Sequence, residues 1–169
     1  MRKVLYPGGV NCAGSVGLLL LRVVMGAAFL LHGWPKIQDP MHWMDAHGGS
    51  GMPGLLQAAA AVSEFGGGLA LILGLLTPLA ALGIACTMAV AVGMVHLRMG
   101  HSFVATAPGQ PSYELAAVYL AAAIMFALVG PGKLSLDAFL FGCSAKLSCS
   151  NTAVYDNVGV RGREEVRSI

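Results

Sequence analysis

The chain has 169 residues, of which 56% are hydrophobic and only 11% are charged, and its mean hydropathy is +0.72. Soluble domains carry about 25% charged residues, so this composition excludes an ordinary soluble protein and indicates a protein embedded in a lipid bilayer. The net charge of +2, without any basic run, gives no electrostatic basis for binding nucleic acid, so we expect no nucleic-acid partner.

Four stretches have the length and the apolar composition of transmembrane helices. An α-helix needs about 20 residues to cross a bilayer. The strands of a β-barrel would alternate apolar and polar residues, and these stretches do not. We therefore predict an all-α integral membrane protein, a four-transmembrane-helix antiparallel bundle. The predicted helices cover residues 15–34, 55–76, 79–97 and 113–129.

This prediction divides the chain into an N-terminal segment (1–14), a membrane domain (15–140) and a tail (141–169). The tail is rich in serine, asparagine, glycine and charged residues, which is typical of disorder. Two basic residues precede the first apolar stretch, as in a signal peptide. Arg22 interrupts that stretch, so we expect a retained helix.

The charges of the connecting segments predict the orientation. Lysine and arginine concentrate on the cytoplasmic side of membrane proteins. More of them lie on the side shared by both ends of the chain than on the opposite side, so we expect both termini in the cytoplasm. The cytoplasmic set is Arg2, Lys3, Lys133 and Lys146, and the outer set is Lys36 and Arg98.

The cysteines follow from this orientation. Cys12, Cys143 and Cys149 lie on the cytoplasmic side, and Cys86 lies within the membrane. Because the cytosol keeps thiols reduced, we expect no disulfide. The reverse orientation would place three cysteines in an oxidising compartment and change this expectation.

Two charged residues interrupt the predicted helices, Arg22 in the first and Glu64 in the second. A charge in hydrocarbon costs about 2.5–3.5 kcal/mol even on the mildest scale. At about 1.5 Å per residue, the two lie about 10 Å and about 18 Å from the cytoplasmic edge, a gap that a flexible arginine can largely cover. They are predicted to form a structural ion pair, or to serve a polar headgroup or protons.

The second predicted helix has a polar, glycine-rich face. Gln57 and Glu64 are seven residues apart, and Gly67 and Gly68 follow one turn later. Small residues permit close helix packing, and beside a carboxylate they could also line a pocket for a lipophilic ligand. The sequence leaves both interpretations open.

Histidines gather at the outer ends of the predicted helices. Trp34 and Lys36 suit the membrane interface, where tryptophan anchors and lysine extends to water, whereas His32 could exchange protons near neutral pH. No compact metal-binding motif is present, so we expect no permanent metal site. The outer set is His32, His42, His47, His96 and His101, with Glu114 beside them.

Four segments, in order along residues 18–140, resemble the DoxX family. They are Leu31-His32-Gly33-Trp34-Pro35-Lys36, Ser63-Glu64-Phe65-Gly66-Gly67-Gly68, Tyr113-Glu114-Leu115 and, most specifically, Gly130-Pro131-Gly132-Lys133-Leu134-Ser135-Leu136-Asp137. The resemblance implies a four-helix protein of the bacterial cytoplasmic (inner) membrane. Some members are membrane subunits of a thiosulfate:quinone oxidoreductase, and others associate with thiol-redox or superoxide-detoxifying proteins. By this resemblance, the positions where the family tends to carry polar residues are occupied by Arg22, His32, Lys36, Glu64, His96 and Glu114.

The leading hypothesis is a membrane subunit of a redox complex that engages a quinone in its outer half. A quinone needs an apolar slot, hydrogen bonds to its carbonyls and a route for protons. The chain has no motif for flavin, haem or nicotinamide, so a partner protein is expected to carry the redox centre. The predicted catalytic residues are Glu64 as proton carrier with Arg22 and His32 as donors, and the predicted quinone-binding residues are Gln57, Gly67, Gly68, His96 and Glu114.

Two other classes of function stay open. The chain could be a non-catalytic scaffold whose charges determine its packing and whose loops hold redox or detoxification partners. It could also be a small transporter or a metal-handling protein that uses the outer histidines, although no broken helices in matching halves support transport. A homo-oligomer is compatible with each of these functions.

Overall fold

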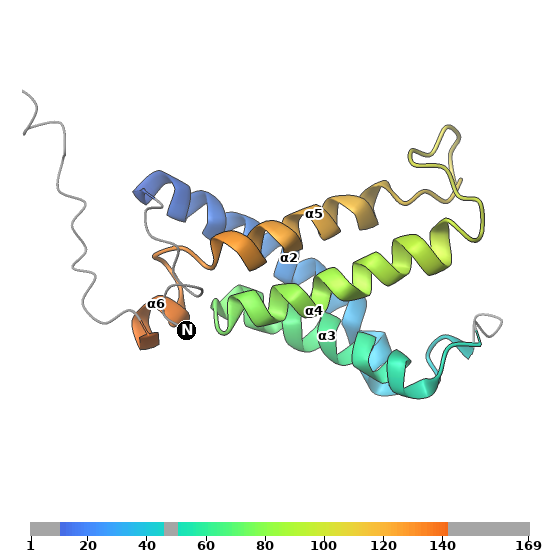
Figure 1. Ribbon diagram of the computed structural model, residues 1–169, viewed down its shortest axis with the longest axis horizontal. Helices are drawn as coiled ribbons and strands as arrows, with labels where there is room; N and C mark the ends of the chain where they lie inside the picture. Colours follow the sequence, from blue (N-terminus) through green and yellow to red (C-terminus); the bar gives the residue numbers. More distant parts are fainter. Residues whose placement is uncertain (1–10, 46–50, 142–169) are drawn as a thin grey trace, which may run out of the picture.

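The computed structural model describes residues 11–45 and 51–141, and within them the chain is helical (Figure 1). Strand pairing in these residues is limited to an isolated bridge between Ser102 and Ser112. The prediction of an all-α protein is therefore confirmed. The helices are α2 (Cys12–Gln38), α3 (Gly54–Leu73), α4 (Thr77–Val90), the π-helix η2 (Ala91–His96), α5 (Glu114–Val129) and the short α6 (Leu136–Phe141).

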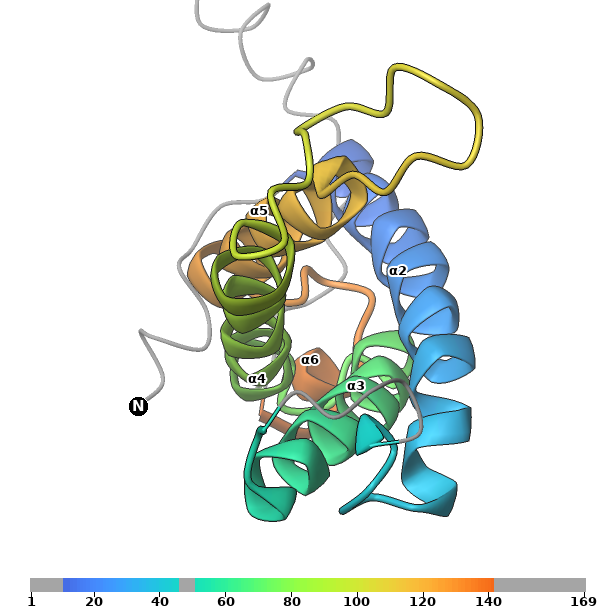
Figure 2. The ribbon, with the colours of Figure 1, turned by 90° about the vertical axis from the view of Figure 1, so that its right-hand side faces the viewer.

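The long helices form two hairpins that lie side by side. α2 packs along α3, α4 packs along α5, and α3 joins the hairpins by packing against α4. In the end-on view, α2, α3, α4 and α5 follow one another around the bundle (Figure 2). The loops after α2 and after η2 lie at one end, and α6 lies at the opposite end (Figure 1). We call these the outer and the inner end, after the predicted orientation.

The helices have the length and composition of membrane spans. Three helical segments are long and apolar enough to cross a bilayer: Cys12–Gln38, Gly54–Leu73 and Thr77–His96, which joins α4 and η2. α5 is also apolar but has 16 residues. Many large apolar side chains, such as Leu20 and Val24, are exposed, which suits a surface that faces lipid. The protein is a helical membrane bundle.

α2 is longer than predicted at both ends. It begins after Asn11, whose side chain accepts a hydrogen bond from the backbone N–H of Gly14 at 2.8 Å and so caps the first turn. At its other end the helix continues through Pro35, although a proline inside a helix removes one backbone hydrogen bond. The predicted end at Trp34 is therefore too early, and Lys36 belongs to the helix.

Glycines bring α2, α3 and α4 close together. A Cβ added to Gly26 would lie 2.6 Å from the carbonyl oxygen of Gly68, and one added to Gly68 would lie 2.8 Å from that of Gly26. A Cβ on Gly67 would lie 3.1 Å from the side chain of Ile84 on α4. Of the two interpretations of Gly67 and Gly68, the contacts support close helix packing.

Residues 130–137, which we call the closing segment, tie the inner end to α2. Two nitrogens of the buried Arg22 guanidinium, Nη1 and Nη2, donate hydrogen bonds to the carbonyl oxygens of Pro131 and Leu134, each at 2.7 Å. A charged donor on a carbonyl makes a strong hydrogen bond. The first transmembrane helix is thus fastened to the chain that follows the last one.

The closing segment also caps α4. The buried Asp137 carboxylate accepts hydrogen bonds from the backbone N–H groups of Leu76 at 2.7 Å and Thr77 at 2.9 Å. Its own backbone N–H donates to the Gly74 carbonyl at 2.9 Å. Because the first N–H groups of a helix have no partner within the helix, the carboxylate replaces the missing partners. The family-like pattern of this segment therefore has a structural role here.

Candidate functional site

Lys36 and Glu64 form an ion pair in the outer half of the bundle. The Nζ of Lys36 lies 2.6 Å from Oε1 and 2.7 Å from Oε2 of Glu64, so the ammonium donates to both carboxylate oxygens. The Glu64 side chain is 3% exposed and the Lys36 side chain 22% exposed. A buried charge is destabilising unless it has a partner, so each residue neutralises the other. The pair is open to its surroundings on the Lys36 side.

The close packing of α2 on α3 brings Lys36 and Glu64 together. A Cβ on Gly33 would lie 2.6 Å from the backbone nitrogen of Phe65, so the two backbones nearly touch beside Glu64. Lys36 follows Gly33 by three residues, and residues three apart lie on the same face of a helix. The continuation of α2 through Pro35 keeps Lys36 in this register.

The indole ring of Trp43 lies over the Lys36 ammonium. The Nζ of Lys36 is 4.4 Å from the ring centroid, which is a cation–π contact. Trp43 belongs to the loop after α2, and its Nε1–H donates a hydrogen bond to the backbone carbonyl of Gln57 on α3 at 3.0 Å. The ammonium is therefore bound by both a carboxylate and an aromatic face.

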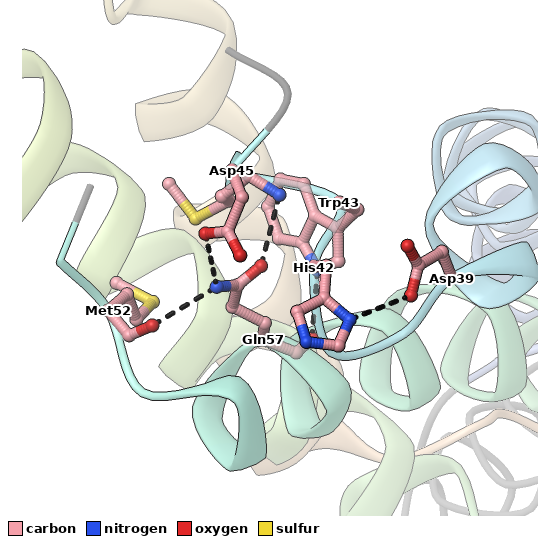
Figure 3. A network of polar contacts seen from close by, with 7 residues as sticks. Asp39, His42, Trp43, Asp45, Met52 and Gln57 are labelled. Carbon is pink, nitrogen blue, oxygen red and sulfur yellow. Dashed lines mark hydrogen bonds and ion pairs between the residues drawn. The ribbon is translucent and has the colours of Figure 1, made fainter. Parts of the chain in front are cut away.

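Gln57 holds the same loop with its side chain (Figure 3). Its Oε1 accepts a hydrogen bond from the backbone N–H of Met44 at 3.0 Å. Its Nε2 donates to Oδ1 of Asp45 at 3.3 Å and to the Met52 carbonyl at 3.1 Å. The predicted common face of Gln57 and Glu64 is real, since both side chains are buried. The Gln57 amide, however, is occupied by the loop.

The expected ion pair between Arg22 and Glu64 is wrong. Arg22 lies beside Gly74, where an added Cβ would be 2.6 Å from its Nη1. Glu64 precedes Gly74 by ten residues, which separates the two by about 15 Å along the axis of α3. The depth estimate failed because it started from the ends of the apolar stretches. α2 begins ten residues before Arg22, whereas α3 ends next to it.

The predicted histidines do not join the pair. His32 is exposed, and among the described residues no hydrogen bond or ion pair links it to Glu64. The Nδ1 atoms of His96 and His101 lie 2.9 Å apart. His96 is the last residue of η2, and the exposed Glu114 is the first residue of α5. The loop that joins η2 to α5, which contains His101, lies at the outer end, away from the loop after α2 (Figures 1 and 2).

The predicted site residues therefore do not converge on one site. Arg22 lies at the inner end, Glu64 pairs with Lys36, and His96 and Glu114 lie at the far hairpin. No three histidine, cysteine or acidic side chains converge as a metal site within the part of the chain that the structure describes.

Cys12 is disulfide-bonded, so the expectation that the cysteines stay reduced is wrong for this residue. Its partner lies outside the described residues, whereas Cys86 is free and exposed. Disulfides persist in oxidising compartments, and the charge distribution predicts that Cys12 faces the cytoplasm. The disulfide therefore favours the orientation opposite to the one that the charge distribution predicts.

Sequence reasoning misread Lys36 and missed Trp43. Lys36 was expected to extend to the membrane interface, but it lies three residues after Gly33, on the face by which α2 packs on α3. The spacing of Gly26, Gly33 and Lys36 is a helical pattern that could have indicated this face. No local pattern marks Trp43, because its position depends on loop contacts with α3.

Comparisons with known proteins point to one family. The DoxX family model matches residues 17–97. "Putative oxidoreductase CatD" of Bacillus subtilis (strain 168) is 31% identical over 132 residues, which cover 78% of this chain and 92% of that protein. "Inner membrane protein YqjF" of Escherichia coli (strain K12) is 30% identical over 129 residues, or 75% of this chain and 93% of that protein. An "Uncharacterized protein" of Haemophilus influenzae is 36% identical over 126 residues, or 73% and 90%. No solved structure matches the chain.

Proposed function

This chain belongs to the DoxX family, and from that premise we propose that it is the membrane subunit of a redox complex and engages a quinone at the Lys36–Glu64 pair. The electrons come from a redox centre on a partner protein. The proposed location is a bacterial inner membrane, with both termini in the cytoplasm. The name of the Bacillus subtilis relative, which describes an oxidoreductase, and that of the Escherichia coli relative, an inner membrane protein, support these proposals.

The observation that carries the proposal is the ion pair in which the Lys36 ammonium donates hydrogen bonds to both carboxylate oxygens of Glu64. An ammonium has three N–H donors, and two of them are directed at the carboxylate oxygens. The third can donate to the carbonyl oxygen of a quinone that approaches the exposed side of Lys36. Reduction of the quinone to the quinol takes up two electrons and two protons. The pair provides a titratable donor and an acceptor side by side through which protons can pass.

The donors in this proposal differ from those expected from the sequence. Arg22 is engaged by the closing segment, and His32 is exposed without a described contact to Glu64. Lys36 takes the place of both. Glu64 keeps the role of proton carrier.

Glu64→Gln tests the proposal, because the amide keeps the shape and a hydrogen-bond acceptor for Lys36 but cannot carry a proton. We expect reduction of a quinone analogue, in membranes that contain the partner proteins, to fall by about 10²-fold, the loss typical of a general acid–base group. Immunoblotting should show the complex still assembled. Asp39→Asn is the matched control, since Asp39 is an exposed acid paired with the exposed His42, and it should turn over normally.

Normal turnover in both Glu64→Gln and Lys36→Met would contradict the quinone site. It would favour the second candidate, a non-catalytic scaffold for redox or detoxification partners. Specific contacts support that alternative: Gly67, Gly68, Gln57 and Arg22 are all used in packing or in holding the chain together. A scaffold predicts that variants of these residues lose partner binding and activity together.

A further inference from the structure

Trp43 is a side chain of the loop after α2 that reaches the Lys36–Glu64 pair. Its ring centroid lies 4.4 Å from the Lys36 Nζ. Lys36 is the more exposed residue of the pair. An indole has a flat, electron-rich face that attracts cations and stacks on planar rings. A planar ring with a carbonyl could therefore lie against Trp43 while its oxygen accepts a hydrogen bond from Lys36.

The position of Trp43 depends on Gln57. The backbone carbonyl of Gln57 accepts the indole N–H at 3.0 Å. Its side-chain amide bonds the chain on both sides of the loop, to Met44 and Asp45 before it and to Met52 after it (Figure 3). One residue of α3 thus holds both the tryptophan ring and the segments on either side of the loop.

The burial of Gln57 indicates that this arrangement is specific. The residue is 1% exposed, and a buried amide is destabilising unless its donors and acceptors are satisfied. An apolar side chain of similar size would pack on this helix face without that requirement. A glutamine here determines where the loop lies.

We propose that Trp43 is a ligand-contacting residue of the Lys36–Glu64 site, and that the quinone ring packs against its indole beside the ammonium that lies over it. Gln57 is the positioning residue that holds Trp43 there. This inference rests on the proposed function. It adds an aromatic platform from the outer loop to a site whose polar groups come from the two helices.

The chain has two tryptophans, Trp34 and Trp43, which permits a direct optical test. In Trp34→Phe the emission comes from Trp43, and in Trp43→Phe it comes from Trp34, whose side chain is exposed beside Phe65. The full-length protein in lipid nanodiscs is titrated with a short-chain quinone analogue. We expect saturable quenching of Trp43 and weak, linear quenching of Trp34. Equal, linear quenching of both would show that the quinone merely dissolves in the bilayer, and would overturn the proposal.

Gln57→Leu tests the positioning role. We expect the Trp43 emission to shift to longer wavelength and the KM for the quinone to rise about tenfold or more, the loss typical of removing a stacking aromatic, with a smaller change in kcat. The matched control is Gln110→Leu. Gln110 holds the other outer loop, where its Oε1 accepts hydrogen bonds from the Thr106 backbone N–H at 3.0 Å and hydroxyl at 2.8 Å. This control should leave KM and the Trp43 emission unchanged.

The outcomes separate this inference from the proposed function. Normal KM and emission in Gln57→Leu, or normal KM in Trp43→Leu, with turnover still lost in Glu64→Gln, would leave the quinone site standing and overturn the role of Trp43. Normal turnover in Glu64→Gln and Lys36→Met would overturn both. Circular dichroism of each variant checks that the bundle is folded. If Gln57→Leu does not fold, Asp45→Ala is the substitute, because it removes the hydrogen bond between the Gln57 amide and the Asp45 side chain of the loop without changing α3. It should also raise KM.

Discussion

Arg22 and Asp137, two buried charged residues of the inner end, both lie against Gly74. The backbone N–H of Asp137 donates to the Gly74 carbonyl at 2.9 Å, and a Cβ on Gly74 would lie 2.6 Å from Nη1 of Arg22. Gly74 has φ +67°, the left-handed conformation that ends α3. This one position requires glycine both for its backbone and for its neighbours.

Gly74→Ala should therefore destabilise the bundle more than a left-handed backbone alone requires. Gly100 is the control: its φ is +70°, but no atom of residues 11–45 or 51–141 lies within 4 Å of an added Cβ. We expect Gly100→Ala to cost about 1 kcal/mol, and Gly74→Ala to cost about 3 kcal/mol, because the methyl group also displaces Arg22 and Ser135. Thermal unfolding in detergent, followed by circular dichroism, measures both. Equal losses would mean that the guanidinium moves aside freely.

The Lys36–Glu64 pair predicts a specific pattern of coupling. Lys36→Ala should destabilise the protein by up to about 3–5 kcal/mol, because it leaves the buried Glu64 charge without its partner. Glu64→Ala should also destabilise the protein but by less, because Lys36 is partly exposed. The double variant should recover at least about 1 kcal/mol of the summed loss. Arg22→Ala combined with Glu64→Ala should be additive to within about 0.5 kcal/mol, since the two residues lie far apart. Strong coupling in that second cycle would restore the ion pair expected from the sequence.

The contact between α2 and α3 predicts that glycines of the same helix differ sharply. Gly26→Ala should destabilise the bundle by about 1–3 kcal/mol, because its Cβ would meet the Gly68 carbonyl and Ile72. Gly17→Ala should be neutral or stabilising, since no described residue lies within 4 Å of its Cβ and alanine favours helices. Detergent melting of the two variants is the measurement. A loss in both would point to a contact of Gly17 beyond the described residues.

The orientation can be tested by thiol labelling in intact cells, with the native cysteines replaced by serine. Ala107→Cys, in the exposed outer loop, should react with a membrane-impermeant reagent. Lys133→Cys, exposed in the closing segment, should be protected until the cells are opened. These outcomes follow from the charge bias of the loops. The opposite labelling pattern would reverse the bundle and place the Cys12 disulfide in an oxidising compartment, where such bonds persist.

The helices were predictable because apolar length and helical spacing are local properties. The stretches that become α2, α3, α4 with η2, and α5 could all be recognised, and the common face of Gln57 and Glu64 was visible in their spacing. The partner of Glu64 was not predictable, because it depends on how far α2 slides along α3. That offset is determined by Gly26, Gly33 and Gly68. Arg22 and Lys36 are about four turns apart on α2, so the offset decides which of them lies near Glu64.

Two other features depend on contacts that no sequence window contains. The role of Asp137 as the cap of α4 joins residues 60 and 61 positions apart. Trp43 reaches Lys36 because Gln57 holds the loop that carries it, and the spacing of apolar residues says nothing about loops. The glycines of α3 could have lined a pocket or packed a helix, and only the positions of the neighbouring backbones distinguish the two.

The bonds between Arg22 and the closing segment also have a consequence for how the protein is made. Their partners are 109 and 112 residues apart in the chain, and synthesis begins at the N-terminus. The first helix is therefore made before Pro131 and Leu134 exist, and its guanidinium at first lacks these two acceptors. Contacts so distant in sequence form late. The last residues of the membrane domain to be made therefore supply hydrogen-bond acceptors for a charge in the first helix to be made.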